Sequence, residues 1–397
     1  MNLDRTLKMG MVGGGFGAFI GEVHRKAAGL IGHIKLVGGA FDIEPRKSKQ
    51  MGKELNLDPK RVYKNYGELI EKELQLPTGE RMDFVTICAP NNWHFPIAKD
   101  LLEAGFHVMC EKPMTLTTKE ARDLVGIVKK TRRVFGLMHN YTGYPMVKLA
   151  KDMVGNGDLG KIRKIVVQYP QDWLATALEK TGQKQAAWRA DPKQGGASGC
   201  GGDIGTHAVN LAEYITGLKT THLCAELTTF VKGRKLADDA NCLIKYNNGA
   251  RGVLHISQVS VGEENNLAIW IYGEKGGLEW HQEEPNHLHV KPLGQPMQVW
   301  KRGNDYVAAY SEAAGRATTL PAGHPEAFYE AMANIYLNFS DVVRARIMRV
   351  KADPIMLDFP NVEDGLRGML FIETLVASAE SDQKWTPFKS NIDMALN

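Results

Sequence analysis

The sequence has little of what would place a protein in a membrane, outside the cell or on nucleic acid. Its 5 cysteines form no CxxC pair and are odd in number, which favours reduced thiols over a disulfide framework. No apolar segment approaches the roughly 18 residues of a membrane span, and residues 1–5 contain no apolar signal core. The net charge is only +4, and no long basic run appears. We therefore expect a cytoplasmic protein with no membrane span, no export signal and no nucleic-acid partner.

The length and rhythm of the chain indicate two domains. A chain of 397 residues exceeds what one ordinary hydrophobic core supports. Strand and helix patterns alternate over residues 8–139, which predicts a doubly wound parallel sheet, and Thr117 and Glu120 predict a capping box for its last helix. From residue 140 onward, strand patterns separated by turn signals predict one large, mainly antiparallel sheet. The expected fold class is α/β, with one domain over residues 1–139 and a second, α+β domain over residues 140–397.

A glycine loop lies near the start of the first domain. The strand pattern of residues 8–12 runs into residues 13–18, and a helical pattern follows. Gly13 would permit a tight turn, Gly15 would let the backbone approach a pyrophosphate, and Ala18 would keep the helix close to the sheet. The amide end of that helix would then face the phosphates. This order predicts a Rossmann domain that binds a dinucleotide, although glycines also serve turn geometry alone.

An acidic residue follows the second predicted strand. Residues 34–41 form the strand pattern, and Asp42 comes directly after it. A carboxylate there accepts hydrogen bonds from the adenosine ribose and repels a 2′-phosphate, so we expect NAD as the cofactor. Arg46 and Lys47 follow closely and keep NADP open, because either cation could reach that phosphate.

Two further groups follow strands of the parallel sheet. In the group formed by residues 89–94, Asn91 and the neighbouring backbone are expected to line the nicotinamide ribose. His94 either contacts the cofactor or only begins the next helix. In the group formed by residues 110–113, Pro113 cannot continue the hydrogen-bond ladder of the sheet. The chain must therefore turn there, through a cis peptide bond if needed. That turn would hold Lys112 at the ligand-binding edge of the sheet. An isolated lysine is usually a surface charge, but this position favours a functional one.

The second domain contains a glycine-rich segment with a carboxylate and an imidazole. Asp203 and His207 are four residues apart, so on a helix they share one face. An imidazole can exchange a proton with an alcohol, and a nearby carboxylate can stabilise its charged form. Such a pair also occurs for structural reasons alone, but the cofactor motifs upstream favour a functional interpretation.

Taken together, these motifs resemble the glucose-fructose oxidoreductase, inositol dehydrogenase and rhizopine-catabolism family, written Gfo/Idh/MocA, over nearly the whole chain. In that family a GxGxxG/A loop is followed by an EKP motif and a GG…DxGxH segment, here at residues 13–18, 111–113 and 202–207. Two departures are an extension of the first loop and Asn210, which stands where many members carry an acidic residue.

The resemblance implies a nicotinamide-dependent dehydrogenase acting on a secondary alcohol of a sugar, sugar derivative or cyclitol. His207 would take the hydroxyl proton, Lys112 would polarise the oxygen, and Asp203 would support them. Two hypotheses from other classes remain open, an NAD-dependent glycosidase that uses transient oxidation and elimination, and a non-catalytic sensor of dinucleotide or sugar. The intact set of three residues argues against the sensor.

The expected site residues fall into three groups. The expected catalytic residues are Lys112, Asp203 and His207. The expected cofactor-binding residues are Gly13, Gly15, Phe16, Ala18, Asp42, Pro90, Asn91, His94, Glu111 and Lys112. The expected substrate-binding residues are Tyr141, Trp188, Arg189, Asp203 and His207. The resemblance places Tyr141 near the substrate. For Trp188 and Arg189, a surface loop with one buried tryptophan is the alternative interpretation.

The second domain is also expected to mediate assembly. Leu267, Ile269 and Ile271 alternate on a strand pattern, and a free sheet face with such residues commonly pairs with a copy of itself. We therefore expect a homodimer or homotetramer that acts on a small sugar or polyol. The spacing of His281, His287 and His289 is that of a solvated strand, so no metal site is expected.

Overall fold

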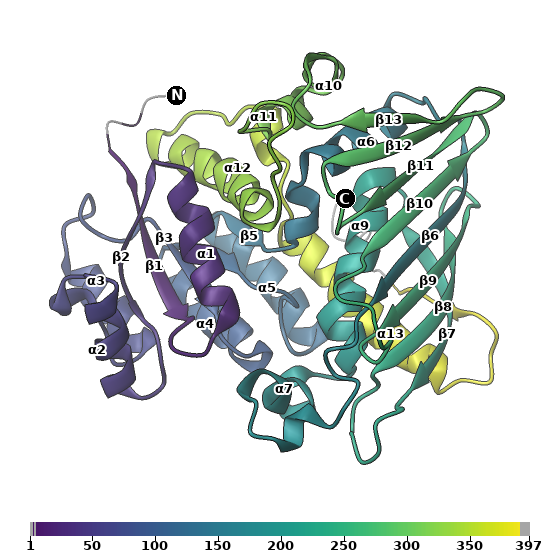
Figure 1. The fold of residues 1–397 in the computed structure, drawn as a ribbon. Coiled ribbons are helices and arrows are strands. Elements are labelled where there is room, and N and C mark those ends of the chain that lie inside the picture. Colours follow the sequence, from purple (N-terminus) through teal and green to yellow (C-terminus); the bar gives the residue numbers. More distant parts are fainter. Residues whose placement is uncertain (1–2, 4, 390–397) are drawn as a thin grey trace. The chain divides into compact units, whose positions relative to one another are not determined.

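The chain divides into two units, whose elements are labelled in Figure 1. The computed structural model describes residue 3 and residues 5–389. The first unit contains the chain up to Asn140 together with Phe328–Leu366, and the second contains Tyr141–Ala327 and the chain from Arg367 onward. Residues 328–366, which the sequence analysis assigned to the second domain, therefore pack with the first.

A five-stranded sheet in the order β2-β1-β3-β4-β5 forms the first unit, and all its neighbouring strands are parallel. The predicted doubly wound sheet is thus confirmed. The predicted capping box is present, since Thr117 and Glu120 bond each other's backbone at the start of α5. The elements are β1 (Leu7–Gly13), α1 (Phe19–Leu30), β2 (Ile34–Ala40), α2 (Pro45–Glu54), α3 (Tyr66–Gln75), β3 (Phe84–Cys88), α4 (His94–Glu103), β4 (His107–Cys110), α5 (Thr118–Thr131) and β5 (Phe135–Leu137).

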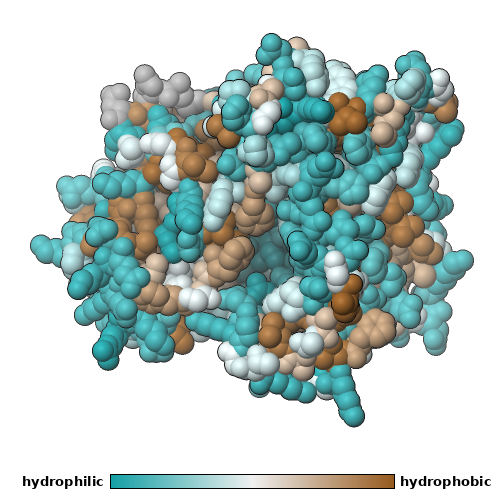
Figure 2. Space-filling model, in the orientation of Figure 1, coloured by the Kyte–Doolittle hydropathy of each residue, from teal (hydrophilic) through white to brown (hydrophobic). Residues whose placement is uncertain are grey.

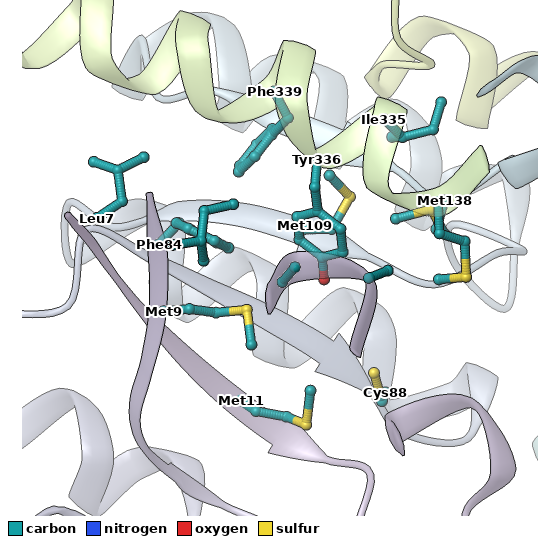
Figure 3. Packing of buried hydrophobic residues seen from close by; sticks show 14 of the residues in the cluster. Leu7, Met9, Met11, Phe84, Cys88, Met109, Met138, Ile335, Tyr336 and Phe339 are labelled. Atoms are coloured by element: carbon teal, nitrogen blue, oxygen red, sulfur yellow. The ribbon is translucent and has the colours of Figure 1, made fainter. Parts of the chain in front are cut away.

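Helix α12 (Phe328–Met348) returns to this sheet from far along the chain and lies beside α1. Figure 3 shows Tyr336 and Phe339 of α12 over the buried side chains of the sheet, with Met109 and Phe84 among them. The rings of Phe84 and Phe339 meet edge to face at 5.2 Å between centroids. Apolar contact with the sheet is why this late segment belongs to the first unit.

A nine-stranded sheet in the order β13-β12-β11-β10-β6-β9-β8-β7-β14 forms the second unit. Only the β6 and β9 pair is parallel, so the predicted mainly antiparallel sheet is confirmed. Helices α6 (Pro145–Gly155) and α9 (Thr206–Thr216) cover one face of it. The strands are β6 (Ile162–Pro170), β7 (Thr220–Thr228), β8 (Asp239–Tyr246), β9 (Arg251–Ser257), β10 (Ala268–Gly273), β11 (Gly276–His281), β12 (His287–Pro292), β13 (Gln298–Lys301) and β14 (Thr386–Pro387).

The sequence analysis expected Leu267, Ile269 and Ile271 on a free face of this sheet, and that expectation was wrong. Leu267, Ile269 and Ile271 are 0%, 2% and 1% exposed, so they point into the core of the unit. Their neighbours on β10, Trp270 and Tyr272, point to the other face, and Tyr272 is 40% exposed. The alternation was correct, but a strand pattern does not say which of its two faces the helices cover.

All five cysteines are free. No helix within residue 3 and residues 5–389 is long and apolar enough to cross a membrane. The face of the molecule in Figure 2 is largely hydrophilic, with apolar residues in scattered groups, which is ordinary for a protein surface.

Candidate active site

The glycine loop is held at the carboxyl ends of β2 and β3. The amide of Gly14 donates to the carbonyl of Cys88 at 3.2 Å. A Cβ on Gly13 would lie 2.3 Å from the carbonyl oxygen of Cys88, and one on Gly15 would lie 2.6 Å from that of Phe41. Since Gly13 also has a φ of +77°, only glycine fits there. The glycine cradle therefore packs directly on the ends of these two strands, which places the loop beside the residue before Asp42 and suits the close approach of a pyrophosphate.

Helix α1 packs closely against the loop at Gly21. Ala18 is the N-cap residue of α1 and makes no side-chain cap. A Cβ on Gly21 would lie 2.3 Å from the Cα of Gly14. Arg25, one turn further along α1, donates to the carbonyl of Gly14 at 2.7 Å. The extension of the loop that the sequence displays thus moves the helix-packing position three residues along the chain.

Asp42 lies where an acidic residue was expected, directly after β2 and Phe41. It is half-buried, and its Oδ1 accepts a hydrogen bond from the amide of Glu44 at 3.0 Å. The exposed Lys47 pairs with Glu44 at 2.5 Å. Asp42 is therefore oriented by its own turn, and one of the two cations near it has a partner of its own.

The group after β3 is built around His94. Asn91 is buried in a short 3-10 turn, and His94 begins α4. The Nδ1 of His94 lies 2.7 Å from the carbonyl oxygen of Pro113, and its Nε2 lies 2.8 Å from that of Ala89. Burial lowers the pKa of this imidazole. Both ring nitrogens face backbone carbonyls, which supports the structural interpretation of His94 that the sequence left open.

The expected turn after β4 is present. The peptide bond between Lys112 and Pro113 is cis. Lys112 is half-buried, whereas Glu111 before it is buried. One carboxylate oxygen of Glu111, Oε2, accepts from the amide of Lys112 at 3.1 Å. Lys112 thus follows directly from the strand edge where the glycine loop and Asp42 also lie.

In the second unit, Asp203 lies in a π-helical segment (Gly201–Gly205) that continues into α9, where His207 is buried. Isolated π turns occur often at functional sites. The Oδ2 of Asp203 accepts from Gln258 at 2.8 Å, and its Oδ1 accepts from Nε of Arg189 at 3.3 Å. The ring of His207 meets that of Tyr141 edge to face, with 4.8 Å between centroids. The expected residues therefore make two sets of contacts, Asp203 with Arg189 and His207 with Tyr141.

Trp188 and Arg189 belong to a short helix, α7 (Lys184–Arg189). The guanidinium of Arg189 lies 4.2 Å from the ring centre of Trp188 and 5.8 Å from that of Trp173. Its Nη1 also donates to the side chain of Gln185 at 2.7 Å. Two aromatic faces and Gln185 thus hold the cation that contacts Asp203.

Sequence reasoning missed three polar residues at this edge of the second sheet: Tyr169, Gln258 and Asn265. The hydroxyl of Tyr169 bonds that of Tyr141 and donates to Asn265 at 2.8 Å. Burial raises the pKa of Tyr169 well above its ordinary value. The signal available was the position of these residues, since β6 and β9 are parallel and end at one edge, where β10 begins. That argument requires the strand order, which the sequence does not contain.

The histidines of the outer strands form a separate group. His281 and His289 both contact Glu279, at 2.8 and 3.8 Å, and Lys291 bonds the other oxygen of that carboxylate. Burial raises the pKa of Glu279, but the bonds from Lys291 and His281 outweigh it and lower the pKa to about 2. Within the described part of the chain, no group of three or more His, Cys, Asp and Glu side chains could hold a metal ion.

The parallel sheet with its glycine cradle defines a Rossmann fold of the kind that binds dinucleotides, and the comparisons with known proteins identify the family. Residues 7–139 match the oxidoreductase family with an NAD-binding Rossmann fold, and residues 147–279 match the GFO/IDH/MocA C-terminal domain. The chain therefore belongs to the GFO/IDH/MocA family, as its motifs predicted, and NAD as the cofactor is confirmed.

Relatives match over almost the whole length. An uncharacterised oxidoreductase, YfiI of Bacillus subtilis (strain 168), is 33% identical over 395 residues, which is 98% of each chain. The structure of an inositol dehydrogenase homologue from Azotobacter vinelandii in complex with NAD+ has a TM-score of 0.91 at 34% identity and covers 97% of this chain and 98% of that one. A second structure of that homologue, with NADH and myo-inositol, has a TM-score of 0.88. The levoglucosan dehydrogenase of Pseudarthrobacter phenanthrenivorans is 29% identical over 229 residues, 52% of this chain and 57% of the relative.

Proposed function

We propose that this NAD-binding oxidoreductase oxidises a secondary alcohol of a sugar, sugar derivative or cyclitol. The observation that carries the proposal is the polar cluster in which Asp203, four residues before the buried His207, is held by Arg189 and Gln258. Polar groups in such a cluster suit a polyhydroxylated ligand, which offers hydroxyls as both donors and acceptors. The names of two relatives, an inositol dehydrogenase homologue and a levoglucosan dehydrogenase, support the same class of substrate.

The cofactor is held by the first unit. The glycine loop suits the pyrophosphate, because Gly13 and Gly15 pack so closely on the backbone of Cys88 and Phe41 that a side chain at either position would displace the loop. Asp42 accepts hydrogen bonds from the adenosine ribose, and Asn91 lies on the strand edge expected to line the nicotinamide ribose. When bound, NAD supplies the hydride acceptor.

Three side chains would handle the reacting hydroxyl. Neutral His207 takes the hydroxyl proton, and the edge of the Tyr141 ring restricts the orientation of the imidazole. Lys112 places a positive charge at the oxygen as it becomes a carbonyl. Asp203 favours the charged form of His207, and its bonds to Arg189 and Gln258 fix the direction of the carboxylate.

The test combines turnover with binding. A panel of sugars, anhydrosugars, amino sugars and inositols is screened for formation of NADH, and NAD is titrated onto each variant. We expect Lys112→Ala and His207→Ala to lower turnover by at least ~100-fold while NAD still binds. Lys119→Ala, whose side chain is 85% exposed, is the matched lysine control and should behave like the wild type.

Three outcomes contradict the proposal. Near-normal turnover in both variants would place the chemistry elsewhere. Loss of NAD binding would assign Lys112 and His207 to the cofactor site instead. Release of a free sugar without net NADH would identify a glycosidase.

We also propose that the protein assembles through the outer face of its large sheet, and we expect it to act in the cytoplasm. Leu243, Val253, Val166 and Trp270 are direct neighbours across β8, β9, β6 and β10, so they form a row on the face that α6 and α9 leave uncovered. Leu243 is 44% exposed. An apolar row on an open face suits a two-fold interface with a second copy of this chain.

A further inference from the structure

A buried polar network joins four elements of the first unit beneath the turn that contains Lys112. The Nε2 of His24, on α1, lies 2.8 Å from Oε1 of Glu111, which follows β4. The Nδ1 of His24 lies 2.7 Å from the hydroxyl of Tyr336 on α12, and that hydroxyl lies 3.0 Å from Oγ1 of Thr86 on β3. His24, Tyr336 and Thr86 are each 0% exposed.

The hydrogen bonds of this network fit a charged pair. Glu111 accepts from His24, and Tyr336 can accept from the other ring nitrogen while it donates to Thr86, so both nitrogens of His24 can carry protons. Burial lowers the pKa of His24, but Cys88 and Glu111 outweigh it and raise the pKa to about 10. Burial raises the pKa of Glu111, but the bond from His24 outweighs it and the net pKa is lowered. A buried carboxylate requires such a partner, because an unpaired one is costly.

The pair connects directly to the backbone of Lys112. While Oε1 of Glu111 faces His24, its Oε2 accepts from the amide of Lys112 at 3.1 Å. On the other side of the turn, His94 lies 2.7 Å from the carbonyl of Pro113. The turn is therefore held from both ends by side chains that lie inside the unit.

We propose that the His24–Glu111 ion pair, anchored by Tyr336, is a positioning device that fixes the backbone of Lys112 at the ligand-binding edge. The sequence suggested that Glu111 binds the cofactor. In this proposal Glu111 instead acts from behind the turn, without touching the cofactor. The inference rests on the proposed role of Lys112. In this proposal α12 has two roles. It covers the sheet, and through Tyr336 it supplies the hydroxyl that holds His24.

The chain offers a matched control for this network. His33 is also a histidine that contacts α12, with its Nε2 2.9 Å from Oγ of Ser340, but it lies far from Glu111 along the sheet, at the opposite end of α1. A general loosening of α12 should therefore follow from His33→Gln as well as from His24→Gln. Displacement of Lys112 should follow only from His24→Gln.

The experiment measures kcat, KM for NAD, NADH affinity and thermal stability for His24→Gln, Tyr336→Phe and His33→Gln. We expect His24→Gln to lower kcat by about tenfold to 100-fold, the range for a reacting group displaced by about 1 Å, with little change in NADH affinity. Tyr336→Phe should lower kcat less, and His33→Gln should leave it unchanged. The double variant His24→Gln/Glu111→Gln, which replaces the pair by two amides, should recover part of the kcat lost in His24→Gln, because no unpaired charge remains.

A spectroscopic measurement tests the pair without any turnover. In nitrogen NMR of the histidine rings, His24 should be doubly protonated at neutral pH in the wild type and lose a proton in Glu111→Gln. A neutral His24 in the wild type would overturn the ion pair. Equal losses of kcat in His24→Gln and His33→Gln, or no loss in His24→Gln, would overturn the positioning role. If the wild type turns over no member of the substrate panel, the proposed function fails, whereas the NMR result still decides whether the pair exists.

Discussion

Replacing Gly21 by alanine should displace the glycine loop, and the structure predicts by how much. The new Cβ would lie 2.3 Å from the Cα of Gly14 and 2.5 Å from its carbonyl oxygen. Carbon atoms in contact are normally about 3.5–4.0 Å apart, so loop and helix must separate by more than about 1 Å. Overpacking of this kind costs about 1–3 kcal/mol. Because the crowded atoms are backbone, no side chain can simply rotate away.

Gly29 lies on the same helix and provides the control. A Cβ there would have nothing within 4 Å. Alanine at either position gains about 1 kcal/mol of helix propensity over glycine, so the difference between the two variants isolates the crowding. Gly29→Ala should raise stability by up to about 1 kcal/mol, and Gly21→Ala should be less stable than Gly29→Ala by about 1–3 kcal/mol. For a unit of this size, 1 kcal/mol corresponds to about 2–4 °C in Tm.

The same displacement should appear in cofactor binding. A loop moved by about 1 Å no longer directs its amides at the pyrophosphate, so NADH affinity should fall by at least about tenfold in Gly21→Ala, or about 1.4 kcal/mol. Gly29→Ala should bind NADH like the wild type. Thermal melts and fluorescence titration with NADH measure the two effects. Equal stability and equal NADH affinity in both variants would refute the assignment of Gly21 as the packing glycine.

Three other predictions follow from single positions. Asp42→Ala should reduce the preference for NAD over NADP, measured as the ratio of kcat/KM; an unchanged ratio would contradict the ribose contact. Burial, and then the charge of Arg133, lowers the pKa of His107 from 6.5 to about 3. Between these two pH values the unfolded chain therefore binds a proton at His107 that the folded chain does not. Stability should therefore fall as pH falls toward 3, by up to about 1.4 kcal/mol per pH unit from this group, and His107→Asn should weaken that dependence in urea melts. Leu243→Arg should dissociate the proposed dimer in light scattering without loss of helix content, and a wild-type monomer would exclude the interface.

The cofactor unit was predictable because its signals are local. A strand, a glycine loop and a helix follow one another within the first 30 residues, and Asp42 comes at the end of the next strand. The turn at Lys112 and the capping box at Thr117 are likewise set by neighbours a few residues away. Parallel order follows from such alternation, because each crossover returns the chain to the same edge.

The position of the packing glycine shows the limit of local signals. The spacing of the motif assigns Ala18, whereas the structure assigns Gly21, because the extended loop delays the start of α1 to Phe19. Alternation has a similar limit, since Ile269 and Trp270 are equally apolar and only the helices packed on the sheet decide which of them is buried. Both positions depend on how elements pack, which local spacing does not contain.

The polar partners of the site were the hardest to foresee. Asp203 and Gln258 are 55 residues apart, and His24 and Tyr336 are 312 residues apart. No spacing rule connects such pairs, because they meet only after strands and helices have packed in a particular order. A sequence therefore predicts which side chains can carry the chemistry more readily than it predicts which ones hold them in place.

The return of α12 has a consequence for what the NAD-binding unit is. Strand β3, next to the strand that carries the glycine loop, and strand β4, which precedes Lys112, bury Phe84 and Met109 against a helix that begins at residue 328. The same helix supplies Tyr336, which bonds His24. A segment limited to residues 1–139 would leave that apolar face in water and would lack Tyr336, the hydroxyl partner of His24, so both the apolar cover and the polar anchor would be missing. The unit that binds NAD is therefore discontinuous in sequence, and the segment matched by the NAD-binding family is only part of it.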